Sequence, residues 1–347
     1  MIPVLFGMSG PVLTAQERAL FLASGPAGYI LFGRNIVDRA QLRALTDDLR
    51  SLSSRQSLPI LIDQEGGRVA RMKPPHWPDF PDGRTFDRLY AIAPATAIAA
   101  ARANATAIAL ELAACGITVN CAPLLDVRQP GTTDAIGDRA LGSEPLRVAA
   151  LGRAILAGLA DGGVVGVIKH MPGHGRALVD SHATLPRVDA DAAMLESDIA
   201  PFKALSRAPH PIAAMGMTAH ILFSAWDDAL PATLSPTIIA RIIRGAIGFD
   251  GLLMSDDISM GALSGDVTDR AIAGLAAGLD VILHCSADLG EMTALATQLP
   301  PMTDAAHARM EAAMTSVRHT APANSPTELA NELADALARR DALLALA

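Results

Sequence analysis

The sequence predicts an α/β fold: a single-domain (β/α)8 barrel of the TIM type with C-terminal closing helices. Short apolar runs alternate with helical segments, and eight such alternations in about 290 residues fit a parallel barrel better than an open doubly wound sheet. The chain has 347 residues and is 50% hydrophobic, so it can bury the core of one large barrel. Polar residues follow five of the eight runs, which is typical of an active site at one barrel mouth.

Each predicted strand is a short apolar run. The runs have strand length, and the helical segments between them allow neighbouring strands to pair in parallel. In chain order the predicted strands cover residues 4–8, 29–32, 60–62, 118–125, 164–168, 212–217, 252–254 and 281–284.

The segments between these runs carry helical periodicity or helix-forming composition. The predicted helices cover residues 14–23, 40–52, 91–115, 145–161, 191–205, 235–247 and 267–277. Two closing helices are predicted over 304–318 and 326–346, the second introduced by Ser325 as cap, Pro326 at the first helical position and Glu328. We therefore expect a barrel over 1–300 and helices packed on it over 301–347.

The charge balance argues against nucleic acid and membrane partners. The net charge is −8, whereas binding to nucleic acid or to an anionic membrane requires a basic surface. The most apolar long segment, 91–115, is interrupted by Arg102, Asn104 and Glu111, so we expect a buried helix rather than a bilayer span.

The amino terminus and the cysteines predict a cytoplasmic protein. No positive charge precedes the apolar start of the chain, as a secretory signal would require, because the first basic residue is Arg18. Cys115, Cys121 and Cys285 are odd in number and form no C-x-x-C pair, which favours reduced thiols.

The polar residues at the ends of the predicted strands are the candidates for chemistry. The carboxyl ends of barrel strands open onto one mouth, so these side chains should converge there. They are Asp63 to Arg71 after the third strand, Asp126 after the fourth, Lys169 and His170 after the fifth, His220 after the sixth, and Asp256 and Asp257 after the seventh. Taken alone, Arg71 and Arg139 could equally well be site residues or ordinary solvated arginines of surface loops.

The loop after the fifth strand is the densest of these segments. It reads Lys169-His170-Met171-Pro172-Gly173-His174-Gly175 and continues to Asp180-Ser181-His182. One residue separates Asp180 from His182, so in an extended loop both side chains can lie on the same side. A carboxylate beside an imidazole fixes its tautomer and stabilises the imidazolium, which makes the histidine a competent proton shuttle.

Asp256 and Asp257 are adjacent, so in an extended chain their side chains point to opposite faces. We expect Asp256 to face the mouth and Asp257 to cap a helix starting near Ser259.

His170 and His174 have the spacing of two metal ligands on a helix, but Pro172 and Gly173 between them break such a helix. We therefore expect no metal, and expect His174 to hydrogen-bond the loop backbone.

These segments together resemble glycoside hydrolase family 3, in particular its single-domain β-N-acetylhexosaminidases of the NagZ type. The shared motifs occur in family order over nearly the whole chain. They are Ile-Asp-Gln-Glu-Gly-Gly-Arg at 62–68, Gly-Asp-Arg at 137–139, Lys-His-x-Pro-Gly-His-Gly at 169–175, Asp-Ser-His at 180–182, Met-Thr-Ala-His at 217–220 and Ser-Asp-Asp-x-Ser-Met at 255–260.

The resemblance implies a retaining hydrolysis without cofactor. Asp256 would be the nucleophile, and His182, paired with Asp180, the general acid/base. The substrate-binding residues would be Asp63, Arg71, Arg139, Lys169 and His170, which in this family hold a terminal N-acetylglucosamine. We expect cationic Lys169 and nearby arginines to lower the pKa of Asp256.

The chain departs from the family pattern at Arg176, where relatives usually carry Asp, and at Met171, where they often carry Phe. Aromatic content is only 3%, which favours a small site that holds one sugar through polar contacts. The resemblance therefore implies a small glycoside or muropeptide substrate, in a cytoplasmic and monomeric enzyme of peptidoglycan recycling.

Three other readings stay open at this stage. A phosphorylase would use phosphate instead of water as acceptor, since a neutral histidine does not repel an anion. A metal-dependent barrel hydrolase would use His170, His174 and His220. A sugar-binding barrel without activity is disfavoured because Asp180, His182 and Asp256 are all present.

Overall fold

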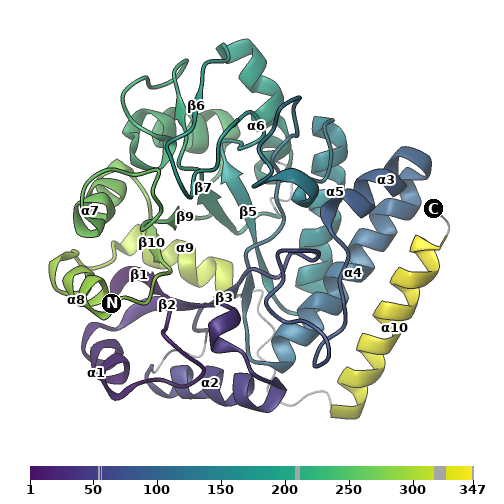
Figure 1. The fold of residues 1–347 in the computed structure, drawn as a ribbon, viewed down its shortest axis with the longest axis horizontal. Helices are drawn as coiled ribbons and strands as arrows, with labels where there is room; N and C mark the ends of the chain where they lie inside the picture. Colours follow the sequence, from purple (N-terminus) through teal and green to yellow (C-terminus); the bar gives the residue numbers. More distant parts are fainter. Residues whose placement is uncertain (54, 56, 208–211, 316–325, 346–347) are drawn as a thin grey trace.

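The computed structural model confirms the predicted (β/α)8 fold (Figure 1). It describes residues 1–53, 55, 57–207, 212–315 and 326–345. Within these residues, eight parallel strands close into a barrel in the circular order β1-β10-β9-β7-β5-β4-β3-β2. Their bounds are β1 Ile2–Phe6, β2 Pro26–Leu31, β3 Ile60–Ile62, β4 Val119–Asn120, β5 Val165–Met171, β7 Met215–Thr218, β9 Leu252–Asp257 and β10 Val281–His284.

The fourth strand is much shorter than the predicted segment 118–125. β4 ends at Asn120, whose side chain accepts from the Gln64 N–H (3.0 Å) and donates to the Gln64 carbonyl (2.9 Å). Pro123 follows and has no N–H to donate to a sheet ladder. Backbone hydrogen bonds continue past Asn120, from the Cys121 N–H to the Ile62 carbonyl (2.8 Å) and from the Leu125 N–H to the Lys169 carbonyl (2.7 Å), but they form no regular strand next to the barrel mouth.

The barrel interior is filled by apolar side chains from all eight strands, and α9 (Asp304–Met314) closes its amino-terminal end. Met310, Ala313 and Met314 of α9 belong to the same buried cluster as the inward-facing strand residues. The opposite, carboxyl-terminal end is thus the end that remains for a functional site.

The helices around the barrel match most of the predicted segments. Their bounds are α1 Ala15–Ser24, α2 Arg39–Ser51, α3 Gly83–Ile92, α4 Pro94–Ala114, α5 Pro145–Asp161, α6 Ala192–Ser206, α7 Val267–Ala277 and α8 Leu289–Gln298, with a helix of π type, η4, at Ile238–Ile247.

Two of these helices correct the predictions. The predicted helix over 91–115 is divided: α3 starts earlier, where the Asp82 carboxylate accepts from the Thr85 N–H (2.9 Å), and α4 starts anew at Pro94. α8 was not among the predicted helices, and it begins where Asp288 accepts from the Glu291 N–H (2.9 Å). Both missed starts are aspartate caps.

The prediction that the long apolar helix is buried is confirmed. α4 is long and apolar enough to cross a bilayer by length and composition, but 67% of its most apolar window is buried inside the protein. α10 (Pro326–Leu344) packs along α4 (Figure 1). The proposed cap Ser325 and the end of the predicted helix over 304–318 lie outside the described residues, and the division near residue 300 stays a prediction.

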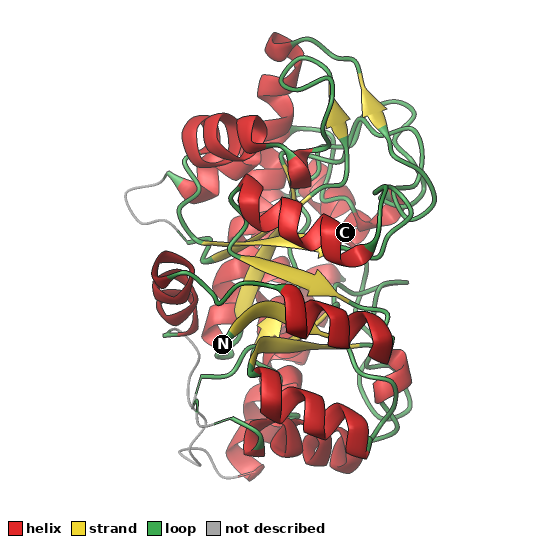
Figure 2. Cartoon of the chain, turned by 90° about the vertical axis from the view of Figure 1, so that its left-hand side faces the viewer, coloured by secondary structure: helices red, strands yellow, loops and turns green. Residues whose placement is uncertain are grey.

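The carboxyl ends of the strands face the side of the molecule where long loops gather (Figure 2). A separate pair of short parallel strands, β6 (Arg187–Val188) and β8 (Leu222–Phe223), lies among these loops. The loops carry the residues that the sequence singled out.

Candidate active site

A cavity of about 260 Å³ lies at this end of the barrel, and the predicted site residues converge on it. Its lining includes all eight of them: Asp63, Arg71, Arg139, Lys169, His170, Asp180, His182 and Asp256. They come from strand ends and loops distributed along the chain, so the predicted convergence is confirmed.

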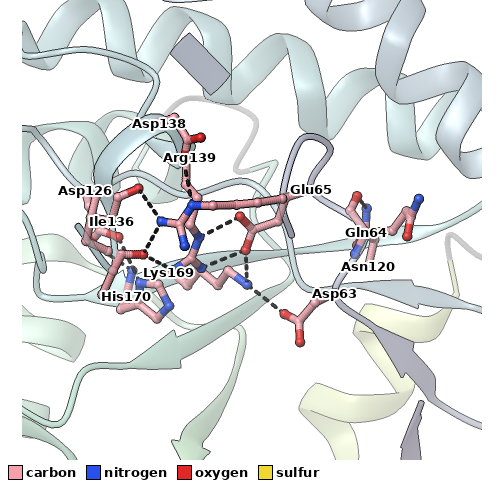
Figure 3. Close-up of polar contacts among 12 residues, drawn as sticks. Asp63, Gln64, Glu65, Asn120, Asp126, Ile136, Asp138, Arg139, Lys169 and His170 are labelled. Carbon is pink, nitrogen blue, oxygen red and sulfur yellow. Dashed lines mark hydrogen bonds and ion pairs between the residues drawn. The ribbon is translucent and has the colours of Figure 1, made fainter. Parts of the chain in front are cut away.

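Lys169 lies at the end of β5 with only 2% of its side chain exposed. Its ammonium nitrogen is 2.9 Å from Asp63 Oδ1 and 2.7 Å from Glu65 Oε1 (Figure 3). Burial favours the neutral amine, but these two carboxylates outweigh it and raise the pKa of Lys169. Lys169 is therefore a fixed cation at the floor of the cavity.

Glu65 connects Lys169 to a second cation, Arg139, and was not among the predicted site residues (Figure 3). Arg139 donates to it through Nε (2.9 Å) and Nη2 (2.8 Å). Burial raises the pKa of Glu65, but Arg139 and Lys169 overcome this and lower it to about 2. Its position after the third strand was the available signal; its pairing depends on loops that only the fold brings together.

Arg71 belongs to the same network through Asp63, with 3.4 Å between Arg71 Nη2 and Asp63 Oδ2. Burial raises the pKa of Asp63, while Lys169 and then Arg71 lower it, and the net shift is downward. Asp63 is thus an ionised hydrogen-bond acceptor in the cavity.

Asp126, a fully buried carboxylate, orients His170. It lies 2.8 Å from His170 Nδ1 and accepts from the N–H groups of His170 (3.1 Å) and His174 (2.6 Å). Burial raises the pKa of Asp126, and His170 reverses the effect, so the value is about 2. With Nδ1 engaged, Nε2 is the ring atom of His170 left for a ligand. The sequence placed Asp126 at a strand end without assigning this role.

The prediction that the His174 ring bonds the loop backbone is wrong. Its Nε2 lies 3.2 Å from the hydroxyl of Ser181, a side chain of the same loop. Burial first, and the neighbouring charge of His170 second, lower the pKa of His174 to about 4. The ring is therefore a neutral, structural element of the loop.

His220 is fully buried and both of its ring nitrogens are engaged: Nδ1 lies 2.7 Å from Thr233 Oγ1, and Nε2 donates to the Asp257 carbonyl (2.9 Å). These contacts leave His220 without a free lone pair for a metal, so the set His170, His174 and His220 lacks one of its three ligands. Across the described ranges, no group of three or more His, Cys, Asp or Glu residues is arranged to hold a metal ion.

Asp256 and Asp257, at the end of β9, have different surroundings. Burial raises the pKa of Asp256. His170, His220 and the Asp257 N–H, which donates to Asp256 Oδ1 (2.8 Å), together lower it by more, so the net shift is downward. Lys169 also lowers this pKa, as expected, but it contributes after these groups, and the main charged groups are the two histidines rather than arginines.

The Asp257 carboxylate is taken up by protein donors. It accepts from the backbone and hydroxyl of Ser259 (3.1 and 2.7 Å) and from the Cys285 N–H (3.1 Å). The expected helix near Ser259 is absent from this described segment, where residues 258–263 form turns and α7 begins at Val267. Asp257 therefore stabilises a turn, and Asp256 is the carboxylate left for chemistry.

The predicted pair of Asp180 and His182 is confirmed as a contact: Asp180 Oδ1 lies 2.7 Å from His182 Nδ1 and accepts from the His182 N–H (2.9 Å). Both side chains are well exposed, 47% for Asp180 and 71% for His182. Burial, the largest single effect, raises the pKa of Asp180, but the two hydrogen bonds from His182 and its charge together outweigh it, and the net shift is downward. The pair lies at the rim of the cavity.

The two departures from the family pattern are accommodated by packing. Arg176 Nε donates to the buried Asp198 of α6 (2.5 Å), which ties the loop to that helix. Met171 is fully buried, and its Cε fills the space beside Gly216. The loop is therefore anchored by contacts of this chain's own residues.

This arrangement combines an ionised, partly buried carboxylate, Asp256, with an imidazole–carboxylate pair at the rim and a floor of hydrogen-bonding ions. Such a set can attack an electrophilic carbon, transfer a proton and bind hydroxyl groups.

Residues 10–321 match the N-terminal domain of glycosyl hydrolase family 3. The chain is 40% identical to a β-hexosaminidase of Alkalilimnicola ehrlichii over 82% of this chain and 80% of that protein. It is 36% identical to a β-hexosaminidase of Aromatoleum aromaticum, over 89% and 86% of the two chains.

Among solved structures, the chain resembles NagZ from Neisseria gonorrhoeae in complex with N-trifluoroacetyl-D-glucosamine. The TM-score is 0.87 at 30% sequence identity, and the match covers 99% of this chain and 97% of that chain.

Proposed function

The chain belongs to glycosyl hydrolase family 3 and is a glycoside hydrolase, and on this premise we propose that it is a retaining β-N-acetylglucosaminidase. It removes terminal N-acetylglucosamine from small glycosides, through a covalent intermediate on Asp256, with His182 and Asp180 as acid/base pair. The observation that carries the proposal is the partly buried, ionised Asp256 in a cavity whose rim holds that pair.

In the first step a carboxylate oxygen of Asp256 forms a bond to the anomeric carbon as the glycosidic C–O bond breaks. The departing oxygen takes a proton from the His182 imidazolium. Nε2 is the donor, because Asp180 occupies Nδ1. The lowered pKa of Asp256 keeps it ionised for this attack.

In the second step water attacks the same carbon and the bond to Asp256 breaks. Neutral His182 accepts the proton from the water, so both proton transfers balance over the cycle. General acid/base catalysis of this kind contributes roughly 10²- to 10⁴-fold. Two inversions at the anomeric carbon retain its configuration, as in glycosidases that use a covalent intermediate.

The cavity suits one sugar. Its volume of about 260 Å³ lies below the ~300–1,000 Å³ of pockets for drug-sized ligands. Asp63, Lys169 and Arg139 offer ionic partners for the hydroxyl and amide groups of a sugar. Among the described residues that line the cavity, Phe32 is the one phenylalanine, tyrosine or tryptophan. The relatives named β-hexosaminidase and the sugar held by the Neisseria structure support an N-acetylated hexosamine as ligand.

We place the reaction in peptidoglycan recycling, on N-acetylglucosaminyl-1,6-anhydro-N-acetylmuramyl peptides, with the enzyme acting as a cytoplasmic monomer. The small cavity, the acidic charge and the family support this assignment. Incubation with such a muropeptide should release free N-acetylglucosamine, with and without added phosphate. Appearance of the sugar 1-phosphate would instead identify the phosphorylase alternative.

The deciding experiment traps the intermediate. A fluorinated N-acetylglucosamine analogue with a good leaving group should label one peptide, and mass spectrometry should map the adduct to Asp256. The protein should release 4-nitrophenol from 4-nitrophenyl N-acetyl-β-D-glucosaminide, and Asp256→Ala should abolish turnover while circular dichroism stays native. A label elsewhere, or full activity of Asp256→Ala, would refute the nucleophile assignment.

A further inference from the structure

The Asp180–His182 pair lies on an exposed segment, yet the segment is fastened at defined points. The residue between the pair, Ser181, is only 4% exposed, and its hydroxyl contacts His174 Nε2 at 3.2 Å. His174 is itself held by Asp126 through its backbone N–H. This first attachment links the exposed pair to the buried start of its own loop.

The second attachment comes from the turn after β9, residues 258–262, which we name the docking turn. The Gly261 N–H donates to the His182 carbonyl (3.1 Å), and the Ala262 N–H donates to the Ser181 carbonyl (3.2 Å). The segment that carries the proposed acid/base is thus hydrogen-bonded to the segment that directly follows the proposed nucleophile.

The docking turn is itself rigidly connected to the barrel. Asp257 binds the N–H and hydroxyl of Ser259 together with the Cys285 N–H of the β10 exit. Arg270 of α7 donates to the carbonyls of Ile258 (3.0 Å) and Met260 (3.3 Å). The turn can therefore act as a fixed surface for the loop.

Position 261 requires glycine because there is no room for a side chain, and not because of its backbone conformation. A Cβ atom at this position would lie 2.9 Å from the His182 carbonyl oxygen and 3.0 Å from that of Ala183. These are backbone atoms, so any side chain would push the His182 segment away from the turn. The backbone of Gly261 itself lies outside the left-handed region.

We infer that Gly261 is a positioning residue that sets the place of the His182 imidazole relative to Asp256, with Ser181 as the second fastening point. This inference rests on the proposed role of His182 as acid/base. Since a displacement of about 1 Å can cost up to 10²-fold in rate, Gly261→Ala should impair the proton transfer without touching substrate or nucleophile.

The test compares two aryl N-acetyl-β-D-glucosaminides by kcat/KM, one with phenol and one with 2,4-dinitrophenol as leaving group. The phenyl substrate needs protonation of its leaving oxygen, and the dinitrophenyl substrate does not. Gly261→Ala should lose roughly 10- to 100-fold on the phenyl substrate and less than about 3-fold on the other. Gly10→Ala is the matched control, because a Cβ there meets open space.

A double-mutant cycle with His182→Ala separates positioning from general damage. In the His182→Ala background, the further substitution Gly261→Ala should have no effect on the phenyl substrate. If Gly261→Ala fails to fold, Ser181→Ala carries the same test, with the same preference for the phenyl substrate and the same loss of effect in the His182→Ala background.

Equal losses on both substrates, or a loss that persists without His182, would overturn the inference. An unchanged Gly261→Ala enzyme would overturn it as well. If His182→Ala by itself shows no leaving-group preference, or the wild type hydrolyses neither substrate, the proposed function fails and this inference with it.

Discussion

The carboxylate of Glu65 lies 2.7 Å from the ammonium nitrogen of Lys169, and both side chains are almost completely buried. The same carboxylate binds Arg139 through two hydrogen bonds. Glu65 therefore positions the charged groups of Lys169 and Arg139 on the cavity floor, although no contact of Glu65 itself with the substrate is proposed.

We predict that Glu65→Gln weakens both binding and stability. Removing one partner of a buried ion pair costs about 3–5 kcal/mol, and Lys169 keeps Asp63 as its one carboxylate partner among the described residues. The variant should unfold at lower urea, and its KM for 4-nitrophenyl N-acetyl-β-D-glucosaminide should rise at least about tenfold, since a shift of 1.4 kcal/mol in binding is tenfold. Glu196→Gln, in an exposed pair with Lys203, is the control and should change neither quantity. Wild-type KM and stability for Glu65→Gln would contradict this role.

His182→Ala should reduce kcat/KM by about 10²- to 10⁴-fold on a phenyl glycoside and much less on a dinitrophenyl glycoside, because only the poor leaving group needs a proton. Asp180→Asn should show the same pattern to a smaller extent, since His182 Nδ1 keeps a hydrogen-bond partner. Steady-state rates on both substrates measure the effect. Equal loss on both would mean that His182 is structural.

Arg176→Ala should destabilise the protein by about 1–3 kcal/mol, the cost of leaving a buried polar group unsatisfied. Asp198 is buried and loses its partner at 2.5 Å. Burial already raises the pKa of Asp198 despite Arg176, so in the variant protonation should relieve the unpaired charge, and the loss should be larger at pH 8 than at pH 4. Urea unfolding at both pH values measures it.

Arg187→Ala removes an exposed pair with Asp189 and is the matched control, with an expected change below about 1 kcal/mol. A loss for Arg176→Ala no larger than that of this control would show that the anchor to α6 carries no stability.

Acid should destabilise the fold through His174. Its pKa is about 4 in the folded protein against 6.5 as the ordinary value, because of burial and the charge of His170. Between these two pH values the unfolded chain therefore binds more protons than the folded protein. The contribution of His174 to the free energy of unfolding is fully present above about pH 6.5. It falls by on the order of 3 kcal/mol as the pH drops to about 4. Urea unfolding from pH 7.5 to 4 should show this fall.

In His174→Gln this part of the pH dependence should be lost, whereas His307→Gln, on the exposed side of α9, should retain it. An unchanged slope in His174→Gln would contradict the assignment.

Much of the fold could be predicted because strand and helix patterns are local. Runs such as 164–168 and 281–284 are apolar, short and bounded, and each corresponds to a barrel strand. The errors lie where a contact between distant segments decides the outcome. β4 ends where the Asn120 side chain binds Gln64, and the segment after Asp257 forms turns where Asp257 also binds the β10 exit.

The candidate site shows the same limit. The residues at strand ends were identifiable because a barrel brings its carboxyl ends to one mouth, and all eight candidates line one cavity. Glu65 and Asp126 stood among those strand ends, but their roles depend on which cation or imidazole lies opposite them. No spacing in the chain encodes that partner.

The sequence by itself determined the barrel and the family and supplied the candidates for the reactive side chains, since apolar periodicity and contiguous motifs are properties of neighbouring residues. The tertiary structure decided which histidines lower the pKa of Asp256, which carboxylate holds Lys169 and Arg139 together, and how the docking turn fastens the His182 segment. These are contacts between segments far apart in the chain, and their energies depend on distance and burial that exist only after folding.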